Sequence, residues 1–222
     1  DECGGMAVVG IMVAAALLKV KTPLVGIIGA AQNMISEDAY LPDDIITTLS
    51  GKTVEIVSTD AEGRLVLADA LTYAQKNFNP KAIIDLATLT GGVVVALGRV
   101  RAGIMSNDEG LSDRLLQAGE RSFERLWRLP LDDEYLTLTK GEDADLKNSG
   151  GREGHAILGG IFLKQFVSDQ IPWAHLDIAG LADGTKELPY CPIGATGFGV
   201  RLILEYINGL ENSDLENLIR AS

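Results

Sequence analysis

The sequence predicts an α/β protein in which helices cover both faces of a mostly parallel, mixed central sheet. Segments of strand length alternate with segments of helix length along the chain. Several strand segments are apolar at consecutive positions, which is typical of strands buried on both faces of a parallel sheet. A chain of 222 residues with 46% hydrophobic and 23% charged residues is also long and apolar enough for one domain with a substantial core.

The first half of the chain is expected to begin with a buried helix at 5–18. Residues 23–33 (PLVGIIGAAQN) form an apolar run of strand length, and a polar loop follows it. Residues 52–59 (KTVEIVST) alternate and are rich in β-branched side chains, which predicts a second strand. A helix at 65–74 and an apolar strand at 81–89 complete this half.

The second half continues the same alternation. We expect a strand at 102–107, a helix at 110–125, a helix at 156–168, a strand at 173–180 and a helix at 196–209. The stretch 128–155 is the most polar of the chain and is expected to be largely loop. No repeat or low-complexity linker interrupts the order, so the pattern predicts a single domain.

Charge and cysteine content narrow the classes of partner. The formal net charge is −12, which argues against nucleic acid as a primary partner and suits metal ions and amino groups. The two cysteines, Cys3 and Cys191, form no CxxC pair, which favours a reducing, cytoplasmic compartment.

The apolar run at 6–18 is too short to cross a bilayer and lacks preceding Lys or Arg, so neither a membrane span nor a signal peptide is expected. The chain starts without Met, and we expect a piece of a longer protein.

The stretch 58–71 (STDAEGRLVLADAL) carries the clearest candidate site. Asp60, Glu62 and Arg64 stand at alternate positions, and in an extended backbone they would point the same way. Ligands of such sheets collect at the carboxyl ends of strands, where residues 59–64 and 88–91 are expected. Two interpretations remain open: an active site, or a capping box formed by Thr59 and Glu62.

Other polar motifs are weaker. The glycine-rich loops at 148–155 and 194–199 lack the spacing and strand context of phosphate-binding loops, so we expect tight turns there. The chain has two histidines, His155 and His175, and the latter shares a strand face with Asp177. No nucleophile motif accompanies this pair, which favours a structural role. Any metal would therefore be held mainly by carboxylates.

Residues 54–74 (VEIVSTDAEGRLVLADALTYA) resemble the signature of the leucyl aminopeptidase, or cytosol aminopeptidase, family. The resemblance continues at 40–56, 82–92, 126–135, 148–163, 173–180 and 194–207. It implies a zinc-exopeptidase-like fold and a two-metal peptidase that removes N-terminal, leucine-like residues from peptides. Residues 1–222 would then be the C-terminal catalytic domain, truncated at its N-terminal side. Ser58 replaces the usual Asn of the signature.

The resemblance also implies roles for individual residues. Asp60 and Glu62 correspond to metal ligands, with Glu62 shared by both ions, and Arg64 corresponds to a catalytic group that holds a bicarbonate. Asp1 corresponds to a third metal ligand, although an alignment on the following glycines would nominate Glu2 instead. The implied substrate-binding residues are Met34, Thr88, Leu89 and Gly91.

Cofactors and partners follow from the same resemblance. It implies two divalent ions, Mn²⁺ or Zn²⁺, peptide substrates and a homo-oligomer, specifically a hexamer. Further family ligands lie upstream of Asp1, so this piece alone is expected to be inactive. The alternatives are a non-catalytic oligomeric scaffold, a DNA-binding accessory protein of the same family, and a phosphate-binding α/β enzyme that uses the glycine-rich loops.

Overall fold

The structure, a computed structural model, describes residues 2–220 except 185, 187–189 and 192, and side chains as far as residue 211. Its helices are α1 (Cys3–Leu18), α2 (Gly63–Phe78), α3 (Gly91–Leu97), α4 (Glu109–Ser122), α5 (His155–Lys164) and α6 (Val200–Arg220), with the 3-10 helices η1 (Thr59–Ala61) and η2 (Asp133–Leu138). No helix among the described residues combines the length and apolarity needed to span a bilayer.

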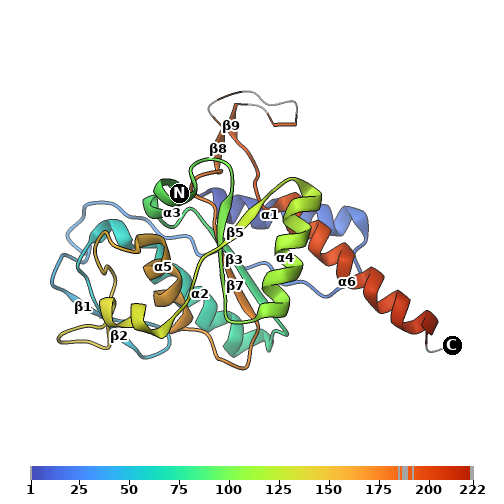
Figure 1. Ribbon diagram of the computed structural model, residues 1–222. Helices are drawn as coiled ribbons and strands as arrows, with labels where there is room; N and C mark the ends of the chain where they lie inside the picture. Colours follow the sequence, from blue (N-terminus) through green and yellow to red (C-terminus); the bar gives the residue numbers. More distant parts are fainter. Residues whose placement is uncertain (1, 185, 187–189, 192, 221–222) are drawn as a thin grey trace.

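The main sheet has four strands in the order β3 (Ile83–Ala87), β7 (Trp173–Asp177), β4 (Ala102–Ser106) and β5 (Leu126–Arg128). The two outer pairs, β3 with β7 and β4 with β5, are parallel, whereas β4 and β7 are antiparallel. A smaller mixed sheet joins β1 (Ile45–Thr47), β2 (Thr53–Glu55) and β6 (Leu146–Lys147). The pair β8 (Asp183–Gly184) and β9 (Gly194–Ala195) projects from the body of the molecule (Figure 1).

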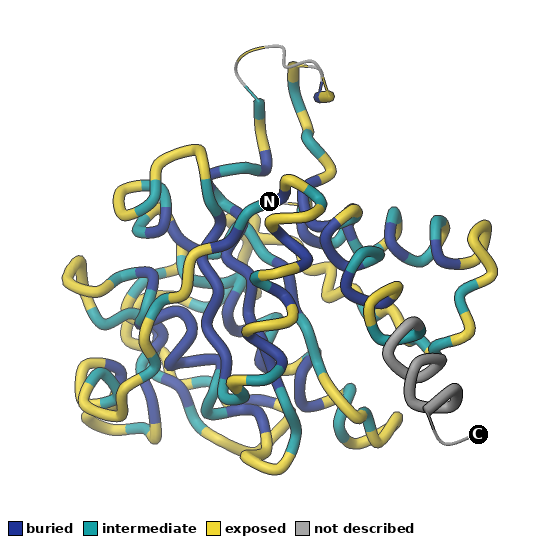
Figure 2. Tube along the Cα trace, turned by 45° about the vertical axis from the view of Figure 1, so that its right-hand side comes forward, coloured by how far each residue is buried: buried dark blue, intermediate teal, exposed yellow. Residues whose placement is uncertain are grey.

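Helices pack on both faces of the main sheet, whose central strands are buried (Figures 1 and 2). On one face of β7, Ala174 and Leu176 enter an apolar cluster with side chains of α1, α4 and α6. On the other face, Trp173 packs with side chains of α2 and α5. Because successive side chains of a strand point to opposite faces of the sheet, the core is divided into two halves, one on each face.

Most of the expected elements are confirmed. Helices occupy the five regions where the periodicity predicted them, and strands lie within 81–89, 102–107 and 173–180. The sequence did not reveal α3, β1, β5, β6 or the projecting pair β8 and β9. These elements span between two and seven residues, too few for a periodic pattern to emerge.

Two expectations are wrong. Residues 23–33 form no strand, because their backbone pairs with no strand among the described residues; they pack against helices instead, with Gly26 beside Met12 and Gly29 beside Val66. Of residues 52–59, 53–55 form a strand, and it belongs to the smaller sheet. The expectation of a mostly parallel, mixed main sheet is confirmed in part: the sheet is mixed, with two parallel pairings and one antiparallel pairing. In residues 23–33 apolarity specified neither burial nor a strand partner, since Val25 is 58% and Ile28 48% exposed.

One buried carboxylate fixes the last helix to the rest of the core. Glu124 lies between α4 and β5 with a side chain that is 1% exposed. Its Oε2 accepts hydrogen bonds from the backbone N–H of Gly199 (3.0 Å) and Leu202 (2.8 Å), and its Oε1 accepts one from Arg201 Nε (3.1 Å). These N–H groups lie at the start of α6, where donors lack intrahelical partners and negative charge is stabilising.

We expect Glu124→Ala to lower the free energy of unfolding by about 3 kcal/mol, because it leaves the helix donors without an acceptor in a buried position. Melting followed by circular dichroism measures the change. Glu120→Ala is the matched control, since the Glu120 side chain is 56% exposed and forms an ion pair with Arg101 at the surface. It should cost less than about 1 kcal/mol. Equal losses for the two variants would contradict the assignment.

Candidate functional site

The segment that carries Asp60, Glu62 and Arg64 is a tight turn. The backbone is extended at Ser58 (φ −142°, ψ 127°), passes through η1, and is helical at Glu62 (φ −74°, ψ −36°), where α2 begins. Strand alternation therefore cannot bring the three side chains together, and that part of the sequence argument is wrong. The capping box of Thr59 and Glu62 is also not formed: Thr59 lies inside η1 and is not the N-cap of α2, and Glu62, which is that N-cap, makes no side-chain cap hydrogen bond. Asp60 is exposed and Glu62 half-buried.

Asn148, which the sequence analysis did not single out, holds this turn. Its buried Oδ1 accepts hydrogen bonds from the N–H groups of Val57 (2.8 Å) and Ser58 (3.2 Å). Its Nδ2 donates to the carbonyls of Ser58 (2.6 Å) and Ala61 (3.4 Å). One amide thus satisfies four backbone groups and ties the turn to the end of β6. The only signal in the sequence was the place of Asn148 at the start of a glycine-rich loop.

Arg64 lies in the first turn of α2 and is buried. Its Nε and Nη1 have no hydrogen-bond partner among the described residues, and its guanidinium lies 5.9 Å from the ring centre of Phe162. Burial lowers the pKa of Arg64 to about 10, and the charges of Asp177 and Glu62 oppose that shift. Arg64 therefore remains a cation at neutral pH, with donors available for an acidic group.

His155, at the start of α5, belongs to the same electrostatic cluster. Burial and the charge of Arg64 lower the pKa of His155, while Asp177 and Asp60 oppose that shift. Gly92 of α3 allows the close approach of this helix, because a Cβ atom there would lie 2.8 Å from the Cβ of His155. Residues from α2, α3, α5 and β7 thus meet around one charged centre.

The loop that follows β3 lies against the start of α2. A Cβ atom on Gly63 would lie 3.8 Å from Leu89 Cδ1, so Leu89 reaches the backbone between Glu62 and Arg64. Thr90 caps α3 by accepting a hydrogen bond from Val93 N–H (3.1 Å). Thr88 is half-buried, whereas Gly91 is exposed with no atom near its potential Cβ position.

Three buried polar side chains lie behind this loop. Asp85 and His175 face each other on the paired strands β3 and β7, with 2.5 Å between Oδ1 and Nδ1. Asp85 Oδ2 also accepts a hydrogen bond from Trp173 Nε1 (2.7 Å). Burial by itself lowers the pKa of His175, but the charge and hydrogen bond of Asp85 outweigh it, and the pKa is raised. His175 Nε2 is buried without a hydrogen-bond partner.

The remaining predicted site residues lie at the ends of flanking segments. Met34 is 71% exposed, and its neighbour Asn33 donates from Nδ2 to the carbonyl of Thr59 (3.4 Å). Asp1 lies outside the described residues, and Glu2, its alternative, is exposed. α1 itself begins at the carboxyl end of β3, where Gly4 packs so closely that a Cβ atom would lie 2.1 Å from the carbonyl oxygen of Leu86.

The donor set fits a divalent cation only in part. Asp60 and Glu62 offer the hard oxygen ligands that such ions prefer, and neither is engaged in capping. Within the part of the chain that the structure describes, however, no group of three or more His, Cys, Asp or Glu side chains is arranged to hold a metal. A complete metal site therefore needs further ligands from outside the described residues.

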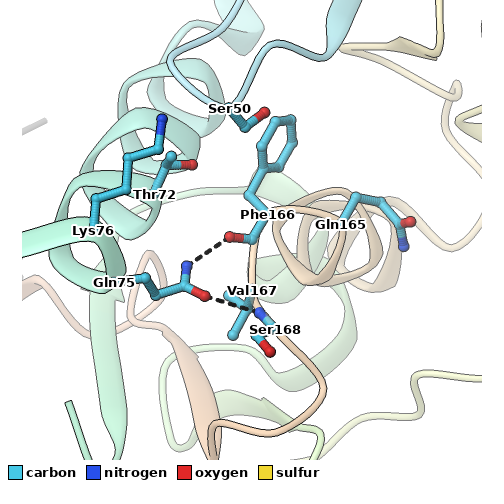
Figure 3. Close-up of a pocket in the computed structure, with 8 residues that line it drawn as sticks. All are labelled: Ser50, Thr72, Gln75, Lys76, Gln165, Phe166, Val167 and Ser168. Atoms are coloured by element: carbon cyan, nitrogen blue, oxygen red, sulfur yellow. Dashed lines mark hydrogen bonds between the residues drawn. The ribbon is translucent and has the colours of Figure 1, made fainter. Parts of the chain in front are cut away.

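A cavity of about 310 Å³ opens elsewhere, between α2 and the end of α5 (Figure 3). Gln75 spans it, donating to the carbonyl of Phe166 (2.8 Å) and accepting from Ser168 N–H (2.9 Å). Lys76 Nζ donates to the carbonyl of Leu49 (2.8 Å). The polar groups of Gln75 and Lys76 are thus already paired with backbone groups, and no Asp or Glu is among the described residues that line the cavity.

Comparison with known proteins gives consistent matches. The family model described as "Cytosol aminopeptidase family, catalytic domain" matches residues 1–204. The chain is 53% identical over 211 residues to a probable cytosol aminopeptidase of Geotalea uraniireducens (strain Rf4), covering 95% of this chain and 42% of that protein. It is 47% identical over 209 residues to the cytosol aminopeptidase of Rickettsia prowazekii (strain Madrid E), covering 93% and 42%.

A solved structure of the K354E mutant of tomato leucine aminopeptidase superimposes with a TM-score of 0.84 at 41% identity, covering 92% of this chain and 40% of that one. The cytosol aminopeptidase of Coxiella burnetii gives a TM-score of 0.74 at 44% identity, covering 80% and 38%. The chain thus spans about two fifths of the length of the proteins that it matches, 42% of the first.

The buried pair of Asp85 and His175 predicts a pH-dependent stability. A raised pKa means that the folded state binds the proton more tightly than the unfolded chain, so the stabilisation is complete below the ordinary pKa of 6.5 and is lost as the pH rises through the raised value. We therefore expect Asp85→Asn to lower the melting temperature more at about pH 5.5 than at about pH 9.

Asp132→Asn, a change of an exposed carboxylate, serves as the control for this experiment and should have little effect at either pH. If the difference in melting temperature between the wild type and Asp85→Asn instead grows with pH, His175 is neutral in the folded protein.

Proposed function

Because the chain belongs to the cytosol aminopeptidase family, we propose that it forms the catalytic part of a metal-dependent aminopeptidase that removes N-terminal, leucine-like residues from peptides. The observation that carries the proposal is the turn at 58–64. Its two carboxylates make no capping bonds, and they lie next in sequence to a buried arginine whose Nε and Nη1 have no partner among the described residues. In this proposal residues 1–222 belong to the C-terminal catalytic domain of the intact protein.

Asp60, Glu62 and Asp1 would be metal ligands, with Glu62 shared by two ions and the remaining ligands supplied from outside the described residues. Two divalent ions, Mn²⁺ or Zn²⁺, would supply Lewis-acid activation of water and of the scissile carbonyl. The oxygen-rich donor set is compatible with either metal.

The chain's own residues would position and orient the substrate. Arg64 would place a positive charge at the reacting centre and could hold a bicarbonate there, because its Nε and Nη1 lack protein partners. Thr88, Leu89 and Gly91 would form the wall that receives the peptide, and the space next to Gly91 leaves room for a substrate backbone. Met34 would contribute to an apolar pocket for the N-terminal side chain.

We also propose that the intact protein is a cytoplasmic homo-hexamer. The relatives are named for the cytosol. On α1, an apolar row that includes Met6 (60% exposed), Val13 (55%) and Leu17 (78%) faces solvent. Exposed apolar rows of this kind are typical of surfaces that another part of the protein or another subunit covers.

Glu62→Ala tests the proposed site in the full-length, metal-loaded protein. We expect kcat to fall on the order of 100-fold or more with the fold intact, because this change removes the ligand proposed to be shared by both ions. Asp60→Ala should cost less. Hydrolysis of leucine 4-nitroanilide and bound metal per subunit are the measurements.

Asp169→Ala, a change of an exposed acidic residue, is the control and should leave both quantities unchanged. Full turnover and full metal content in Glu62→Ala would refute the proposed site.

Light scattering tests the proposed assembly. The full-length protein should have the mass of six subunits at micromolar concentration, whereas a monomer would exclude the hexamer.

A further inference from the structure

Strand β7 has one apolar and one polar face, and the polar face is completely buried. Trp173, His175 and Asp177 alternate along it, and all three have essentially no exposed surface. Buried polar and charged groups are costly unless partners satisfy them. The first two side chains are engaged with Asp85. The third, Asp177, has its partners in the loop that follows β3 and, at Ala179, in the turn that follows β7.

Asp177 is the centre of the hydrogen bonds that hold this loop. Its Oδ2 accepts from the hydroxyl of Thr90 at 2.6 Å. Its Oδ1 lies 3.1 Å from Leu89 N, 3.4 Å from Thr90 N and 3.3 Å from Ala179 N. Since Thr90 also caps α3, one carboxylate determines where the loop ends and the helix begins.

Charge gives Asp177 a second connection to the site. Its negative charge opposes the effect of burial on Arg64, although no hydrogen bond between these two side chains is present among the described contacts. Behind it on the same face, His175 is paired with Asp85. The buried groups Asp85, His175, Asp177 and Arg64 thus alternate in sign, so that each charge has a neighbour of opposite sign.

We propose that Asp177 is a positioning residue: it holds Leu89 and the rest of the 88–91 wall in the geometry that receives the peptide substrate. This rests on the proposed function, since the wall binds a peptide only if the protein is an aminopeptidase. Asp177 touches neither substrate nor metal in this scheme. It acts through the backbone of Leu89 and the hydroxyl of Thr90.

The test compares Asp177→Asn, Thr90→Val and Thr90→Ser in the full-length, metal-loaded protein, with leucine 4-nitroanilide as the probe. Asn keeps an acceptor for Leu89 N–H but removes the charge, whereas Val keeps the shape of Thr90 but removes its hydroxyl. We expect KM to rise about tenfold in Asp177→Asn and in Thr90→Val, with a smaller change in kcat. Thr90→Ser, which keeps the hydroxyl, should have the KM of the wild type. The double variant Asp177→Asn/Thr90→Val should raise KM little more than the larger of the two single changes does.

Asp169→Asn is the matched control, because it makes the same chemical change at an exposed position. A lowered melting temperature with unchanged KM in both Asp177→Asn and Thr90→Val would overturn the proposal and leave the proposed function standing. If Asp177→Asn does not fold, an unchanged KM in Thr90→Val has the same consequence. A wild-type protein without aminopeptidase activity would overturn both proposals.

Discussion

The carboxylate of Asp177 connects the end of β7 to the loop after β3, and the arrangement of the candidate site depends on this connection. Parallel pairing brings the ends of the two strands together at Ala87 and Asp177, but it does not define the path of the chain beyond them. The hydrogen bonds to Leu89 and Thr90 define that path and set the start of α3. Leu89 is thereby brought against Gly63 and the turn that carries the acidic pair.

The same arrangement occurs in three places. Asp177 accepts backbone hydrogen bonds from the loop after β3, Asn148 from the turn before α2, and Glu124 from the start of α6. In each case one buried polar side chain satisfies several backbone groups that helices and strands leave unpaired. Such groups are expensive to bury alone, so each of these side chains fixes a segment of irregular backbone to the regular core.

Several features of the described residues leave the candidate site and its surroundings incomplete. The donor set around Asp60 and Glu62 is incomplete among the described residues. The apolar segment at 23–33 has no strand partner there, and an apolar row of α1 is exposed. The relatives are more than twice as long as this chain, which spans 42% of the first of them. Under the proposed function, contacts with other parts of the intact protein would account for these features.

The sequence by itself determined the family, through the signature at 54–74, and the long helices and central strands, because periodicity is a local property of the chain. It also identified Asp60, Glu62 and Arg64 as a group worth attention, although the reason it offered, strand alternation, is wrong. Only the tertiary structure decided that residues 23–33 pair with no strand among the described residues, that β7 runs antiparallel to β4, and that Asn148 and Asp177 hold the turn and the loop of the candidate site. The contacts of Asn148 and Asp177 join groups about 90 residues apart along the chain, and no local pattern records which groups will meet once the core has formed.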